Sequence, residues 1–196
     1  MRKNEVSVYA AAMLWALALQ GCGGGASTAA APAAVTLGGT AAVGAPIVGA
    51  TIGLVCAGGV ALTSAPTSST GAWQLTLGSQ ALPCAAKLSG GTVNGNTNTV
   101  QYHSIATSAG TMNITPLTDL LVANMAGVAP ATWFAGLPTN NALAAVNAAS
   151  VTAALTQLRA GLALTQLTTV NPIVLPFSPV AGNLMDDPLS SLQTAL

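Results

Sequence analysis

The side chains that could do chemistry are few, and the first is the single histidine, His103. One histidine cannot supply a two-histidine zinc site or the His-Glu-x-x-His helix of metallopeptidases. A hydrolase could use His103 as a base oriented by Asp119, but the chain has no Gly-x-Ser-x-Gly nucleophile elbow. We therefore interpret His103 as a surface or half-buried strand residue, and keep a hydrolase built on it as an alternative.

Carboxylates and aromatic rings give two weaker candidates. Asp186 and Asp187 are adjacent, so they do not share one face, and Asp187 is interpreted as a helix cap. Trp73, Trp133 and Phe134 could form a stacking platform for a carbohydrate, although Trp73 is better explained as a core anchor. No catalytic residue, metal ligand or cofactor is predicted.

Charged residues are scarce. From residue 22 onward the chain has two basic and three acidic side chains, a net charge of −1. These are Lys87, Arg159, Asp119, Asp186 and Asp187. Such a surface cannot form a basic stripe for phosphates, so we expect no nucleic-acid binding. Steering of an ionic substrate is equally unsupported.

The N-terminus has the pattern of an export signal. Arg2 and Lys3 precede an apolar run at residues 8–19, which as a helix is about 18 Å long. That length is too short for a bilayer core of about 30 Å. The run ends in Leu-Ala-Leu-Gln-Gly-Cys at residues 17–22, which resembles the lipobox of bacterial lipoprotein precursors.

The lipobox resemblance implies a maturation pathway. Residues 1–21 would be a cleaved signal peptide, and Cys22 would carry diacylglyceryl and N-acyl chains, such as palmitate, that hold the protein on the membrane. Residues 22–34, rich in Gly, Ala, Ser and Thr, are predicted to be a flexible tether. Gly23, where family members kept at the inner membrane have Asp, implies sorting to the outer membrane. An ordinary secretory signal remains the alternative.

With Cys22 lipidated, two cysteines remain. Cys56 and Cys84 make an even pair in an oxidising compartment, where disulfides persist. A bond between them would close a loop of about 28 residues and stabilise the fold by about 3–4 kcal/mol. Two buried free thiols packing as small apolar groups are the alternative.

Residues 41–62 contain no charge, and a hydropathy scan would mark them as a membrane span. Pro46 and five glycines oppose a helix there, and Ile52, Leu54 and Cys56 alternate with smaller residues at the period of a strand. We predict a strand. A small integral membrane protein spanning 41–62 remains an alternative.

Further strands follow at short intervals. Trp73, Leu75 and Leu77 alternate with polar residues, and Cys84, Ala86 and Leu88 alternate with Ala85 and Lys87. Asn-Gly at 94–95 predicts a hairpin before a strand at 97–105. The short spacing favours antiparallel sheets packed as a sandwich over a βαβ fold.

These strands also carry a family resemblance. The runs Gly-Ala-Pro-Ile-Val-Gly-Ala-Thr-Ile at 44–52, Gly-Ala-Trp-Gln-Leu at 71–75 and Leu-Pro at 82–83 resemble the carboxypeptidase regulatory-like domain. Residues 113–119 are similar to a segment that follows this domain in exported proteobacterial proteins, so the likeness covers about 35–125. The resemblance implies a transthyretin-like β-sandwich at 35–112, with no catalytic residues.

Residues 113–196 are predicted to be a helical and loop appendage. Thr115 is the expected N-cap of a helix with Pro116 in its first turn, an apolar face at Leu117, Leu120, Leu121 and Met125, and its end at Gly127. Ser150 is the expected cap of a second helix, and Asp187-Pro188 opens a last turn. We expect the apolar stripes to pack on the sandwich.

Taken together, the residues predict a mainly β protein with C-terminal helices that is exported and held on the membrane by Cys22. The expected role is non-enzymatic, as a structural or binding module for another envelope protein or a glycan.

Overall fold

The computed structural model of this chain describes residues 34–139, 141–162 and 170–195. The predicted signal peptide and Cys22 lie outside the described residues, as does the tether up to residue 33. The account below concerns the part of the chain from Ala33 onward, which forms one compact unit.

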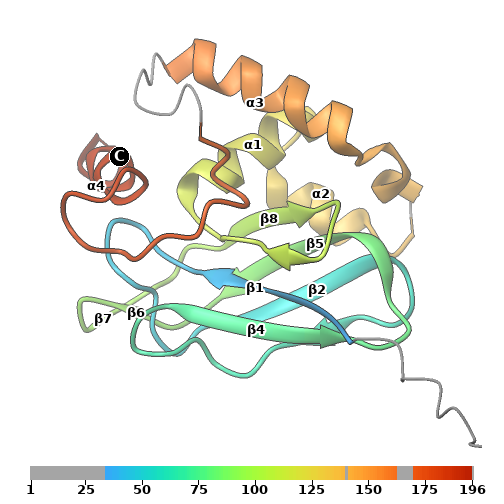
Figure 1. Ribbon diagram of the computed structural model, residues 1–196, viewed down its shortest axis with the longest axis horizontal. Helices are drawn as coiled ribbons and strands as arrows, with labels where there is room; N and C mark the ends of the chain where they lie inside the picture. The colour runs from blue at the N-terminus through green and yellow to red at the C-terminus, as the bar shows by residue number, and fades with distance from the viewer. Residues whose placement is uncertain (1–33, 140, 163–169, 196) are drawn as a thin grey trace, which may run out of the picture. The chain divides into compact units, whose positions relative to one another are not determined.

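Two larger sheets and a small hairpin make up the strand content (Figure 1). The four-stranded sheet has the order β3 (Leu62–Thr63), β2 (Thr51–Gly58), β5 (Ala81–Ser89), β8 (Tyr102–Ala106), and every neighbouring pair is antiparallel. The three-stranded sheet has the order β4 (Ala72–Leu77), β1 (Val35–Thr40), β9 (Gly110–Thr111), with β1 and β9 parallel. The hairpin joins β6 (Thr92–Val93) to β7 (Asn96–Thr97).

One buried cluster takes side chains from both larger sheets. Leu37 and Trp73 enter it from the three-stranded sheet, and Ile52, Leu54 and Leu88 from the four-stranded sheet. Alternate residues of each strand supply these side chains, as the period of two requires. Residues 41–62 therefore include β2, whose Ile52, Leu54 and Cys56 are core residues. Among the residues that the structure describes, no helix is long and apolar enough to cross a membrane.

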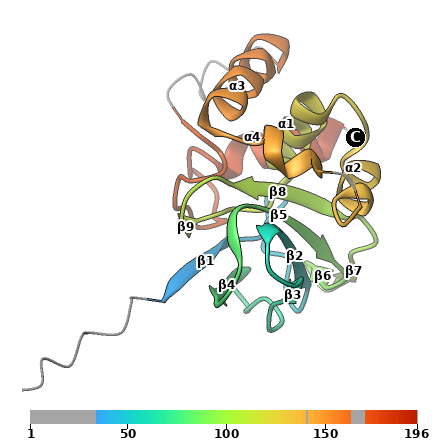
Figure 2. The same ribbon diagram turned by 90° about the vertical axis from the view of Figure 1, so that its right-hand side faces the viewer.

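Helices cover the opposite face of the four-stranded sheet, as Figure 2 shows. They are α1 (Pro116–Ala126), α2 (Pro130–Gly136), the 3-10 turn η1 (Asn141–Ala145) and α3 (Ala148–Leu162); α4 (Asp186–Ala195) contacts α1. A second buried cluster joins Ala85 and Ile105 of the sheet to Leu121 and Leu155 of the helices. The predicted β-rich, largely antiparallel core followed by C-terminal helices is confirmed. The apolar residues of α1 and α3 pack on the sheet as expected, whereas Leu189 of α4 packs in a third cluster with Ala42 and Leu117.

Helix α1 begins and ends where its local sequence predicts. The Thr115 side chain accepts a hydrogen bond from the Thr118 N–H, and the Thr118 hydroxyl accepts one from the Thr115 N–H. Gly127 closes the helix in a left-handed conformation. The predicted apolar face was wrong in one position, because Leu120 is 38% exposed.

Two other boundary predictions were wrong. The side-chain oxygen of Asn147 accepts the N–H groups of Ala149 and Ser150, so Asn147 and not Ser150 caps α3. The strand predicted at 97–105 is interrupted: β7 ends at Thr97 and β8 begins at Tyr102. Between them, the Asn98 amide donates to the carbonyls of Gly90 and Val100, and these bonds hold the chain in a turn.

A buried asparagine ties the C-terminal loop to the three-stranded sheet. The Asn113 Oδ1 accepts the Thr40 N–H at 3.1 Å, and its Nδ2 donates to the carbonyls of Pro172 at 3.1 Å and Leu175 at 2.7 Å. Asn113 is fully buried, so its removal would leave these three backbone groups without this hydrogen-bond partner.

We expect Asn113→Ala to lower the free energy of unfolding by about 3 kcal/mol, because each polar group left without a hydrogen-bond partner costs about 1–3 kcal/mol. Urea denaturation would measure the change. Asn96→Ala is the matched control, because the Asn96 side chain is exposed and makes no hydrogen bond. Equal stability of the two variants would contradict the role given to Asn113.

Candidate functional site

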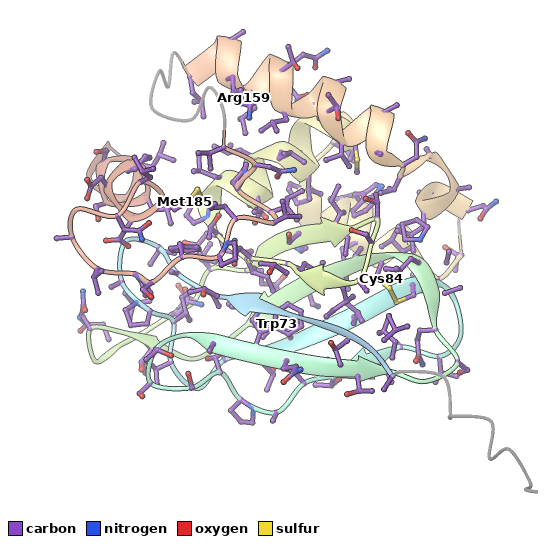
Figure 3. The ribbon with its side chains drawn as sticks, viewed as in Figure 1. Trp73, Cys84, Arg159 and Met185 are labelled. Atoms are coloured by element: carbon purple, nitrogen blue, oxygen red, sulfur yellow. A yellow bond between two sulfur atoms is a disulfide. The ribbon has the colours of Figure 1, made fainter. Side chains whose placement is uncertain are left out.

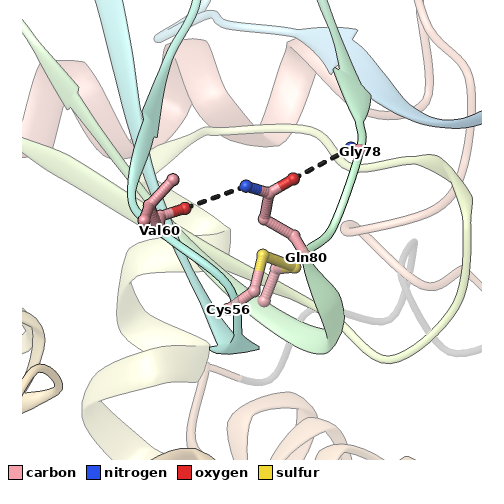
Figure 4. The surroundings of a disulfide bond; sticks show 5 residues. Cys56, Val60, Gly78 and Gln80 are labelled. Atoms are coloured by element: carbon pink, nitrogen blue, oxygen red, sulfur yellow. Dashed lines mark hydrogen bonds between the residues drawn. A yellow bond between two sulfur atoms is a disulfide. The ribbon is translucent and has the colours of Figure 1, made fainter.

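The two remaining cysteines lie directly opposite each other on β2 and β5, and a disulfide joins them. Their Cα atoms are 3.9 Å apart, and both side chains lie in the cluster between the larger sheets. Beside the bond, the Gln80 side chain donates to the Val60 carbonyl and accepts the Gly78 N–H (Figure 4). The predicted disulfide is therefore confirmed, and the alternative of two free thiols is not what the structure shows.

His103 and Asp119 are brought together by β8 and the first turn of α1. The Asp119 Oδ1 accepts the backbone N–H of His103 at 2.9 Å and lies 2.7 Å from Nδ1 of its ring. The Thr118 hydroxyl donates to the His103 carbonyl at 2.9 Å. These contacts bind the start of α1 to β8, and they agree with an Nδ1–H tautomer that donates to the carboxylate.

The prediction that His103 is at the surface or half-buried was wrong, since only 1% of it is exposed. Its ring lies 5.7 Å from the ring of Phe134, and its Nε2 has no hydrogen-bond partner. Lys87, directly opposite on β5, places its Nζ 5.5 Å from the centre of the Phe134 ring. The sequence predicted a strand here but not that helices cover this face.

A catalytic triad does not form around His103 among the residues described. The adjacent Ser104 points to the opposite face of β8, because neighbouring strand residues alternate. No described hydroxyl or thiol bonds to Nε2, which is buried. The buried His103 and the half-buried Asp119 thus form a pair with no nucleophile among the described residues, and no cluster of three possible metal ligands occurs in the described ranges.

The proposed aromatic platform is not formed. Trp73, labelled in Figure 3, belongs to the cluster between the sheets and is 6% exposed, as expected for a core anchor. Trp133 and Phe134 belong to the separate cluster beneath the helices. The three rings therefore do not share one surface.

The two neighbouring carboxylates have different surroundings. Asp187 Oδ1 accepts the Gly182 N–H from the preceding loop, and α4 already begins at Asp186, so the interpretation of Asp187 as a cap was wrong. Asp186 is 2% exposed, and its Oδ1 has no hydrogen-bond partner. Burial raises the pKa of the Asp186 carboxyl above its usual value, and the charge of Asp187 raises it further.

A groove of about 770 Å³ lies where the β6–β7 hairpin, β8, α1 and the ends of α3 and α4 meet. Its apolar lining includes Val43, Val100, Leu120, Leu162 and Leu192, and Asn and Thr side chains from residues 94–99 form one wall. Asp119 and Tyr102 also line it. Sequence analysis missed this groove; the exposed Asn and Thr run after the hairpin was the available signal.

Comparison with known proteins adds no relative: no family model, no curated protein and no solved structure matches this chain.

The raised pKa of Asp186 leads to a pH-dependent prediction. Because the folded state favours the protonated carboxyl, Asp186 stabilises the fold below its unfolded pKa, and this contribution is lost as the pH rises through the folded pKa. Asp186→Asn should therefore be more stable than the parent at pH 7, and the difference should shrink under acidic conditions. Urea denaturation across this pH range would test it; a variant less stable at pH 7 contradicts the assignment.

Proposed function

We propose that this chain is an exported lipoprotein whose folded part serves as a non-enzymatic structural or binding module of the cell envelope. Its signal peptide is residues 1–21, Cys22 carries the acyl chains, and the absence of Asp at position 23, which is Gly23, favours sorting to the outer membrane. Another envelope protein or a glycan is the expected class of partner.

The disulfide between Cys56 and Cys84 is the observation that carries this proposal. Structural disulfides persist in oxidising compartments and are rare in reducing ones. The bond uses both cysteines of the described fold, and it leaves Cys22 as the single cysteine available for another role. That residue is the one that ends the lipobox-like run.

The fold supports assigning the domain as a transthyretin-like sandwich. Two sheets share one buried cluster, and β1 has an antiparallel neighbour on one side and a parallel one on the other. The segments that resemble the regulatory-like domain include the first two residues of β2, most of β4 and two residues near the start of β5. Such domains bring no catalytic residues with them.

A binding role agrees better than a hydrolase with the environment of His103. A general base must reach the proton that it removes, whereas Nε2 of His103 is buried and its ring packs against Phe134. The Asp119 contact instead joins β8 to α1.

The intact mass of the full-length gene product, isolated from the membrane fraction, tests the proposal. We expect a chain that begins at Cys22, carries diacylglyceryl and N-acyl groups, and gains two alkyl groups only after reduction. Cys22→Ser should abolish the lipid mass and leave the alkylation pattern unchanged, because Cys56 and Cys84 are unaffected. An unlipidated parent chain, or one that retains Met1, would overturn the lipoprotein assignment.

A further inference from the structure

The groove beside α1 has the dimensions of a small-molecule site. Its volume of about 770 Å³ lies within the range of about 300–1,000 Å³ typical of ligand sites. Such sites are mostly apolar and contain a few polar groups that orient the ligand. Here the valine and leucine side chains provide the apolar surface, and Tyr102 and Asp119 are the polar groups that could orient a ligand.

Asp119 lines this groove, and the described contacts engage only one of its two carboxylate oxygens. Its Oδ1 is engaged by the backbone N–H and the ring of His103. No described residue donates a hydrogen bond to its Oδ2, and the side chain is 26% exposed. The buried His103 contacts Oδ1 through both its backbone N–H and its ring. These two contacts restrain the orientation of the carboxylate before any ligand binds.

The charge in the groove is of one sign. Among its described lining residues, Asp119 is the only carboxylate, and there is no Lys, Arg or His. Burial and the negative charge of Asp119 both raise the pKa of the Tyr102 phenol, so Tyr102 is neutral at physiological pH. A cation on the ligand would meet a partly desolvated carboxylate and no competing positive group.

We propose that this groove binds a small molecule with an apolar body and one ammonium group, and that the ammonium is held by Oδ2 of Asp119. The apolar body lies along Leu120, Leu162 and Leu192. This inference goes beyond the proposed role, because its ligand is a small molecule and not another envelope protein or a glycan. It does not depend on the lipid anchor, since the described residues that line the groove all lie from Val43 onward.

The experiment is a calorimetric titration of the full chain, purified in a non-ionic detergent, with 4-phenylbutylammonium. Titrations with 4-phenylbutanoate and 4-phenylbutanol, which share its apolar body, isolate the contribution of the head group; detergent without protein is the blank. A charge-assisted hydrogen bond is worth about 1.5–3 kcal/mol, so we expect the ammonium to bind roughly tenfold or more tightly than the carboxylate.

Two variants locate the binding. Asp119→Asn keeps an oxygen for His103 but removes the charge, and should abolish the preference for the ammonium over the alcohol. Leu120→Arg places a cation on the exposed wall of the groove and should weaken ammonium binding at least tenfold. Val128→Arg is the matched control, because Val128 is also exposed and lies outside the groove.

Each other outcome overturns the inference. Equal binding of the three probes would show that the carboxylate does not select the ligand. Unchanged binding in Leu120→Arg, with the chain still folded by circular dichroism, would place the probe elsewhere. These results are independent of the intact-mass test: an unlipidated chain that binds the ammonium would reject the anchor alone, and a lipidated chain that binds no probe would reject the groove alone.

Discussion

Strand β5 is buried on both faces, and the rest of the described fold depends on this burial. Cys84, Ala86 and Leu88 contribute to the cluster between the sheets, and Ala85 contributes to the cluster beneath the helices. Ala85 and Ala86 are fully buried and carry only a methyl group, so the layers on both sides can approach the strand backbone closely. The helices are thus a structural cover for the sheet and not a detachable addition.

That cover explains the polar contacts between β8 and α1. Once helices pack on the face that carries Lys87 and His103, each polar group there requires a partner. Asp119 provides one for the His103 ring and backbone, and Lys87 extends over the Phe134 ring. The same turn of α1 that satisfies its own N-terminus through Thr115 and Thr118 therefore also fixes the helix on the sheet.

Local patterns in the sequence predicted what depends on local geometry. The cap at Thr115, the stop at Gly127 and the turn at Asn94-Gly95 each depend on residues within one turn of the chain, and all three occur. The core face of β2 and β5 followed from alternation, which places Cys56 opposite Cys84 once the register is set. The burial of His103 could not be predicted from alternation. The helices that cover it are α1 and α2, and their packing depends on contacts distant in sequence.

The groove escaped prediction for the same reason, since its walls come from five segments that alternation and capping cannot bring together. The ligand preference proposed for the groove depends on how few charged side chains the described fold contains. The Lys87 ammonium lies over the Phe134 ring, Arg159 donates to the Val170 carbonyl, and Asp187 accepts the Gly182 N–H. Each of these three charged side chains therefore has a partner within the fold. In the described part of the chain, the Asp119 carboxylate accepts hydrogen bonds only at Oδ1. In surroundings of amides, hydroxyls and aliphatic groups, one half-engaged carboxylate dominates the local field, and the groove can therefore discriminate by charge with a single residue.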